Sequence, residues 1–196
     1  MPEARVAGPL LAAIDAATRW LGDANVPAAV IGGVAASLLG RPRVTKDVDF
    51  LALADESLWP ELLRVGHPHG VRPRIDDALE FARTTRVLLL VHQSSQIELD
   101  VSFAGLPFER ELIERATVKA VRGISFRVAR AEDILIMKAL ALRPRDVADI
   151  EGILTVAQEL DLDRVKTAIA EFSRALESDD FSSEFARILK RVKRGP

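Results

Sequence analysis

The sequence predicts an α+β protein in which a small mixed sheet with flanking helices is followed by a helical lobe. Short runs rich in β-branched and apolar residues, bounded by turn residues, recur between helical patterns up to Val128. From Ala131 onward, apolar residues recur only at helical spacing. We therefore expect an α/β lobe over residues 1–130 and a C-terminal helical lobe over residues 131–196.

The first part of the chain alternates helical and strand-like segments. Apolar residues at helical spacing predict the first helix, and Gly40 and Pro42 stop the second. The predicted elements, in order, are a helix over 7–21, a buried strand over 27–31, a turn at Gly32-Gly33, a short helix over 34–39 and a strand over 44–53.

The middle of the chain predicts two hairpins, and the last third predicts helices alone. Two glycines and two prolines break the pattern over 66–74, which predicts a loop there. The remaining predicted elements are a helix over 56–65, strands over 85–91 and 96–103, a helix over 108–116, strands over 118–121 and 124–128, and helices over 131–142, 144–160, 165–176 and 185–192.

The balance of charge excludes one broad class of protein. With 27 basic and 29 acidic residues the net charge is −2, so the chain lacks the global basic field of proteins that bind nucleic acid non-specifically. A local patch could still contact RNA, and its candidates are Arg72, Arg74, Arg83 and Arg86.

Three absences limit the kind of protein that the sequence can encode. It has no cysteine, no signal-peptide pattern and no long apolar run. Without cysteine, any metal must be held by oxygen or imidazole ligands. The N-terminus lacks the pattern of a signal peptide, and no apolar run approaches the ~20 residues that span a bilayer. We expect a cytoplasmic protein with no membrane partner.

Three aspartates on predicted strands indicate a metal site. Asp47 and Asp49 lie two apart in a strand-like segment and therefore project from the same side. Two such carboxylates repel each other and lose hydration, which costs several kcal/mol unless a cation compensates. Asp100 stands on a second strand, on the same side as Glu98. The alternative is that these are surface carboxylates that protect an edge strand from aggregation.

The glycine pair ahead of these aspartates indicates a phosphate site. Gly32 and Gly33 follow an apolar run and precede a helical one, so their amides can approach an anion without a Cβ in the way. The alternative is a tight turn from strand to helix.

Taken together, these motifs resemble the nucleotidyltransferase superfamily of the DNA polymerase beta type. Gly32-Gly33, a short helix, Asp47-x-Asp49 and a later strand aspartate, Asp100, occur in the order of that superfamily. Two longer motifs resemble the AbiEii-like branch of that superfamily, which includes toxins of type IV toxin-antitoxin systems. These are Arg43-x-Thr45-Lys46-Asp47-x-Asp49, and Lys138 followed by Arg145-Asp146-x-x-Asp149. The chain departs from the pattern where many members carry Gly-Ser, because its serine is displaced to Ser37.

The resemblance implies an enzyme that transfers a nucleoside monophosphate from an NTP to a hydroxyl acceptor with the help of two Mg²⁺ ions. The acceptor could be RNA such as a tRNA 3′ end, a protein or a small molecule, and a toxin-like member would have an antitoxin partner. The residues implied as catalytic and metal-binding are Asp47, Asp49 and Asp100. Those implied to bind the nucleotide are Gly32, Gly33, Ser37, Lys46 and Lys138.

Two alternatives stay open at this point. The chain could be a catalytically inactive module that kept the fold and binds a nucleotide or a partner. The carboxylates of Asp146 and Asp149, which with Arg145 begin a helix, either satisfy the amides of its first turn or act where the two lobes meet.

Overall fold

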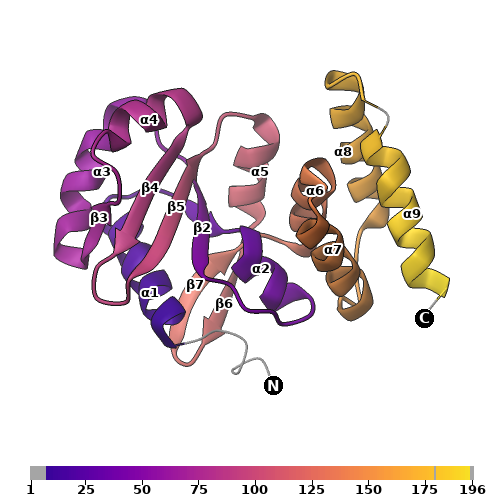
Figure 1. Cartoon of the computed structure of the whole chain (residues 1–196), viewed down its shortest axis with the longest axis horizontal. Helices are drawn as coiled ribbons and strands as arrows, with labels where there is room; N and C mark the ends of the chain where they lie inside the picture. Colours follow the sequence, from indigo (N-terminus) through magenta and orange to yellow (C-terminus); the bar gives the residue numbers. More distant parts are fainter. Residues whose placement is uncertain (1–7, 179, 195–196) are drawn as a thin grey trace. The chain divides into compact units, whose positions relative to one another are not determined.

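The computed structural model describes residues 8–178 and 180–194, which form two compact units. The first unit contains the described residues up to Val34 together with Val44–Ala129, and it holds the whole sheet (Figure 1). The second contains Ala35–Arg43 and the chain from Arg130 onward, and it is helical. The expected boundary lay at residue 130, whereas the contacts also assign the segment Ala35–Arg43 to the helical unit.

The first unit is built on a seven-stranded mixed sheet with the order β3-β4-β5-β2-β1-β7-β6 (Figure 1). The β2–β5 and β1–β7 pairs are parallel, and the other pairs are antiparallel. This confirms the α+β class predicted from the sequence. The strands are β1 (Ala28–Val30), β2 (Asp47–Ala52), β3 (Val71–Pro73), β4 (Val87–His92), β5 (Ile97–Phe103), β6 (Thr117–Val121) and β7 (Ile124–Val128).

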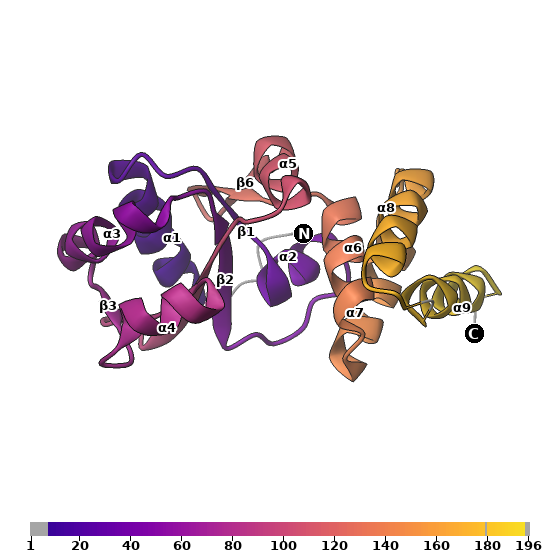
Figure 2. The same ribbon diagram turned by 90° about the horizontal axis from the view of Figure 1, so that it is seen from above.

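Helices flank this sheet, and the first of them supplies much of the core. The helix α1 packs its predicted apolar stripe inward, and Trp20 adds an indole N–H that donates to the Leu62 carbonyl at 2.8 Å. Leu62 lies on α3, which runs beside α1 (Figure 2). The helices are α1 (Gly8–Asp23), α3 (Trp59–Gly66), α4 (Ala78–Thr85) and α5 (Pro107–Arg115), with 3₁₀ turns η2 (Glu56–Leu58) and η3 (His67–His69).

Three elements of this unit were not predicted. The prediction of a loop over 66–74 was wrong, because this segment forms η3 and then β3, which pairs with β4. The strand β3 is three residues long, and its proline is tolerated because β3 is an edge strand. The helix α4 went unpredicted because it buries only Ala78 and Ala82, which form no large apolar stripe.

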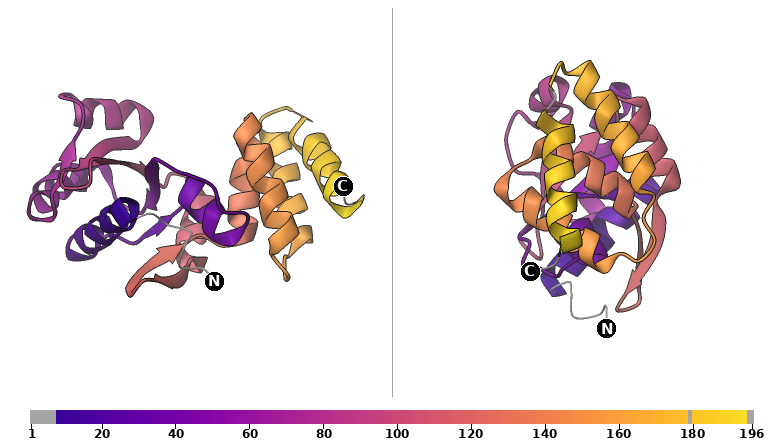
Figure 3. Two further views of the ribbon diagram at one scale, coloured as in Figure 1. Left: turned by 60° about the horizontal axis from the view of Figure 1, so that its bottom comes forward. Right: turned by 90° about the vertical axis from the view of Figure 1, so that its right-hand side faces the viewer.

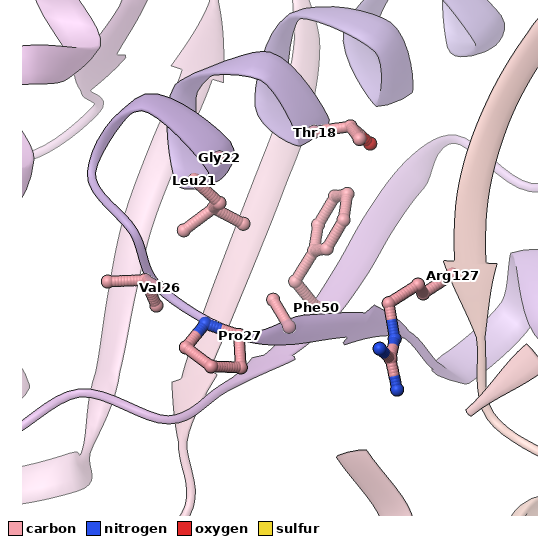
Figure 4. A pocket seen from close by; sticks show the side chains of 8 residues that line it. Thr18, Leu21, Gly22, Val26, Pro27, Phe50 and Arg127 are labelled. Carbon is pink, nitrogen blue, oxygen red and sulfur yellow. The ribbon is translucent and has the colours of Figure 1, made fainter. Parts of the chain in front are cut away.

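The two faces of strand β2 lie in different surroundings, one in the core and one carrying the aspartates. Val48 and Phe50 are buried, and Phe50 points toward α1, where it lines a cavity of about 210 Å³ with Thr18 and Leu21 (Figure 4). Because successive side chains of a strand alternate, Asp47 and Asp49 project from the opposite face of the sheet. The strand begins at Asp47, and the preceding residues that were expected to extend it lie outside it.

The second unit contains four helices and the end of a fifth. They are α6 (Ala131–Ala141), α7 (Pro144–Val156), α8 (Leu162–Ala175) and α9 (Asp180–Arg194), together with the C-terminal part of α2 (Gly32–Leu39). The helices α8 and α9 lie side by side (Figure 3). The helix α7 ends four residues earlier than expected, because the backbone becomes extended at Ala157. Asp161 then caps α8 by accepting a bond from the Arg164 amide at 2.9 Å.

The segment Ala35–Arg43 follows α7 closely because two glycines permit it. A Cβ on Gly40 would lie 2.7 Å from the Ile153 amide nitrogen, and one on Gly152 would lie 3.1 Å from that of Arg41. Within the part of the chain that the structure describes, no helix has the length and apolar character needed to cross a membrane.

Candidate active site

Four carboxylates share one face of the sheet because β2 and β5 pair in parallel. Asp47 lies opposite Glu98, and Asp49 lies opposite Asp100. The residue between each pair along its strand, Val48 or Leu99, is fully buried on the other face. The register therefore brings the three predicted aspartates together in two adjacent cross-strand rows, with Glu98 beside them.

Asp49 contacts the beginning of α2. The amide of Gly33 donates to the Asp49 carboxylate, Oδ2, at 3.4 Å. Gly32 has a φ of +61°, and a Cβ there would lie 1.8 Å from the same oxygen. Only glycine meets both requirements, since it adopts positive φ without strain and leaves room for the carboxylate. The paired glycines thus bring the start of α2 to Asp49.

Asp100 is held by an arginine that the sequence motifs did not include. The guanidinium of Arg74 donates to Asp100 Oδ1 at 2.5 Å and lies 3.6 Å from the Glu98 carboxylate. Arg74 follows β3 directly, and its amide donates to the Leu89 carbonyl on β4. Its side chain therefore reaches across β4 to the carboxylates of β5.

The donor set on this face fits a hard divalent cation. Asp47, Asp49 and Asp100 offer carboxylate oxygens alone, which are the ligands that Mg²⁺ prefers. The Asp49 carboxylate fills the space that a side chain at Gly32 would take, and the guanidinium of Arg74 already contacts Asp100. Across residues 8–178 and 180–194, no three carboxylate or imidazole groups are already gathered closely enough to hold an ion. Binding would therefore require these side chains to move toward one another.

The predicted nucleotide ligands are divided between the two units. Gly32 and Gly33 lie beside Asp49 in the first unit, and Lys46, directly before β2, is exposed there. Ser37 and Lys138 belong to the second unit. The hydroxyl of Ser37 donates to the Arg43 carbonyl at 3.2 Å, so it closes a turn within that unit.

Lys138 occupies the centre of a buried ionic cluster in the second unit. Its ammonium lies 3.0 Å from Asp146 Oδ1 and 2.7 Å from Asp149 Oδ2. The guanidinium of Arg43 pairs with both oxygens of Asp149, at 2.7 and 3.0 Å, and that of Arg143 donates to Asp146 at 2.6 Å. These contacts support a structural role for Lys138, and its role in binding a nucleotide stays a prediction.

The same cluster accounts for Asp146 and Asp149, for which the sequence left two roles open. Burial would raise the pKa of Asp146, but hydrogen bonds from Arg143 and Lys138 outweigh it and leave the pKa below its usual range. The pKa of Asp149 is likewise lowered, because Arg43 and Lys138 outweigh its burial. Both carboxylates are therefore ionised at neutral pH and hold the segment Ala35–Arg43 and α6 to α7.

The four arginines considered as a local RNA patch all make contacts within the protein. Arg72 donates to backbone carbonyls including that of His67, and Arg74 pairs with Asp100. Arg83 pairs with Glu56 and Glu80, and Arg86 donates to the carbonyls of Phe103 and Ala104. All four guanidinium groups thus have intramolecular partners.

Arg74 lies beside the carboxylates although no motif in the sequence predicted it there. Asp100 is 26 residues away along the chain, and the contact depends on β3, in a segment where the sequence predicts a loop. One signal was present: Arg72 and Arg74 have the spacing of two residues on one face of a strand.

A family model described as "Nucleotidyl transferase of unknown function (DUF2204)" matches residues 11–193. The chain belongs to this family. The match covers both units and confirms the nucleotidyltransferase assignment made from the motifs. A comparison with curated proteins gave no match.

Solved structures show that this nucleotidyl transferase shares its fold with distant proteins. An antigenic nucleotidyltransferase-like protein from Paracoccidioides brasiliensis is 20% identical, with a TM-score of 0.55 and 94% of each chain covered. The antibiotic-resistance factor ANT(2'')-Ia is 18% identical, with a TM-score of 0.59 over 85% of this chain and 92% of that one. Another structure of ANT(2'')-Ia, in complex with adenylyl-2''-tobramycin, has a TM-score of 0.57 at 18% identity over 85% and 98%.

Replacement of Gly32 by alanine should destabilise the first unit by on the order of 3 kcal/mol, because the new Cβ meets Asp49 at a positive φ. Gly22→Ala is the matched control, since a Cβ there meets nothing within 4 Å, and we expect a gain of about 0.5 kcal/mol. Urea denaturation followed by circular dichroism measures both. Equal effects of the two substitutions would contradict the close approach of Asp49 to Gly32.

Replacement of Lys138 by methionine should cost about 3 to 5 kcal/mol, because it leaves buried carboxylates with too little compensating charge. Lys166→Met is the control, since Lys166 pairs with Asp163 on the surface and should change stability by less than about 0.5 kcal/mol. Thermal and urea denaturation measure the difference. A Lys138→Met variant as stable as wild type would refute the central position of this ammonium.

The ionic cluster should make the protein sensitive to acid. Because the pKa values of Asp146 and Asp149 are lowered on folding, their contribution is complete at neutral pH. It is lost as the pH falls below the ordinary aspartate value of about 4, where the unfolded chain takes up protons first. Urea midpoints between pH 7 and pH 3 should fall less steeply in Asp149→Asn than in wild type. An equal slope would contradict the assignment.

Proposed function

We propose that this family member is a Mg²⁺-dependent nucleotidyltransferase that moves a nucleoside monophosphate from an NTP to a hydroxyl group and releases pyrophosphate. The family assignment supports nucleotidyl transfer in general. The observation that carries the finer proposal is the placement of Asp47, Asp49 and Asp100 on one face of the sheet, beside the glycine start of α2.

The three aspartates would hold the two Mg²⁺ ions that the motifs imply. The ions would neutralise charge on the triphosphate and lower the pKa of the acceptor hydroxyl. A set of mutually repelling carboxylates gains stability from such a partner, which explains why three of them can share one face of the sheet.

The remaining steps can be assigned to residues of the same unit. The acceptor oxygen forms a bond to the α-phosphorus, and the bond from that phosphorus to the bridging oxygen breaks, so that pyrophosphate leaves with the electron pair. Asp100 accepts the proton of the acceptor hydroxyl. The Gly33 amide, at the positive end of α2, would donate to a phosphate oxygen. Lys46 supplies a point charge for the triphosphate.

A hydroxyl-bearing small molecule is the acceptor that we propose. The arginines considered for an RNA patch are occupied by intramolecular contacts, which removes the main argument for RNA. A solved relative in fold, ANT(2'')-Ia, is described with an adenylylated tobramycin. The AbiEii-like assignment, a toxin role with an antitoxin partner, and a cytoplasmic location stay predictions.

A transfer assay tests this proposal. The protein is incubated with Mg²⁺, each α-labelled NTP and either a panel of hydroxylated small molecules or total tRNA. We expect label on a small molecule together with released pyrophosphate. The rate should fall by on the order of a thousandfold in Asp47→Asn and Asp49→Asn, because charge stabilisation of the transition state is lost.

Asp55→Asn is the matched control, because Asp55 is exposed and lies beyond the end of β2. It should retain wild-type activity. Transfer that survives in both Asp47→Asn and Asp49→Asn would overturn the metal assignment. Label on tRNA alone would overturn the choice of acceptor. Nucleotide binding without transfer to any acceptor would favour an inactive binding module instead.

A further inference from the structure

One arginine is aligned with the site carboxylates across the sheet. The Arg74 amide bonds to Leu89, Leu89 lies opposite Asp100, and Asp100 lies opposite Asp49. These four residues form one cross-strand row, so their side chains project from the same face. Arg74 is therefore the cation that this row places on the carboxylate face.

The contacts of Arg74 are specific and partly shielded from solvent. Its guanidinium donates to Asp100 Oδ1 at 2.5 Å and to the Leu90 carbonyl at 3.2 Å, and it lies 3.6 Å from Glu98. The side chain of Arg74 is 23% exposed and that of Asp100 is 30% exposed, so water screens the pair only in part. A charge-assisted bond in such surroundings is strong enough to fix the position of a carboxylate.

We propose that Arg74 is a positioning residue that acts as an internal counter-ion for Asp100. It neutralises this carboxylate in the metal-free protein and releases it when a divalent ion binds with Asp47 and Asp49. This inference rests on the proposed function, because it presupposes that the aspartates bind metal. Arg74 and the ion compete for the same oxygens, which is consistent with the absence of a gathered ligand set among the described residues.

The competition has a consequence for the order of binding. The Arg74 guanidinium on Asp100 weakens the binding of a metal ion in the absence of nucleotide, because the two cations repel each other. A nucleotide brings its own negative charge, which attracts both the ion and the released guanidinium. Metal should therefore enter this site more readily with the triphosphate than alone.

Arg72, which lies within β3, offers a matched comparison for Arg74, which directly follows that strand. It lies two residues earlier and projects from the same face, but its guanidinium donates to the carbonyls of His67 and Val71 at 2.8 and 3.0 Å. Removing Arg72 thus removes the same charge from the same edge of the sheet without releasing a site carboxylate.

The test is a titration with Mn²⁺, followed by electron paramagnetic resonance in the absence of nucleotide. Arg74→Gln should bind Mn²⁺ roughly tenfold more tightly than wild type, because a neighbouring positive charge is lost. Arg74→Lys, which keeps the charge, and Arg72→Gln should stay within about threefold of wild type. The rise of the melting temperature on adding Mg²⁺ should likewise be larger in Arg74→Gln than in wild type.

The outcomes separate this inference from the proposed function. Wild-type binding of Mn²⁺ with equal or weaker binding by Arg74→Gln overturns the role of Arg74 and leaves the metal site standing. Failure of both proteins to bind Mn²⁺ overturns the metal site and this inference together. If Arg74→Gln does not fold, hydrogen exchange at the Arg74 guanidinium of wild type decides: faster exchange on adding Mg²⁺ supports release, and unchanged exchange refutes it.

Discussion

The parallel pairing of β2 with β5 is the constraint on which the candidate site depends. It places four carboxylates on one face of a sheet whose other face is core, so like charges lie close together on strands whose register is fixed. The surrounding structure reduces this repulsion in two ways. An amide at the start of α2 bonds to Asp49, and the guanidinium of Arg74 pairs with Asp100. Both partners supply positive charge or an N–H donor to a carboxylate, which is the compensation that a bound metal ion would provide under the proposed function.

The helical unit also contains neighbouring carboxylates, but it compensates their charge with buried cations of its own. There, Asp146 and Asp149 are almost entirely buried, and every oxygen of these two carboxylates has a cationic partner within the same unit. Such a cluster holds helices together but offers no room for a ligand. Motif residues from one family pattern therefore have different physical roles. The aspartates of the sheet are half-exposed and adjustable, whereas those of α7 are buried and fixed.

The strands of the candidate site and the glycine turn beside them could be predicted from the sequence, because each is marked by a pattern within a short segment of the chain. The alternation along β2 and β5 placed the aspartates on one side, and the glycine pair indicated the close approach at the start of α2. Arg74 could not be predicted in the same way, because its contact depends on β3, a three-residue edge strand without a pattern of its own. Lys138 was expected to bind the nucleotide because of its place in the family motif, whereas its partners eight and eleven positions later become neighbours only when α6 packs against α7.

The alternation along β2 also limits how this protein can change over evolutionary time. Asp49 and Phe50 are adjacent in the chain, yet one belongs to the carboxylate face and the other lines the cavity under α1. An insertion or deletion of one residue within Asp47–Ala52 would exchange the two faces, burying carboxylates and exposing the core in a single step. Length variation among relatives should therefore be confined to the connections on either side of this strand, while the strand itself accepts only substitutions.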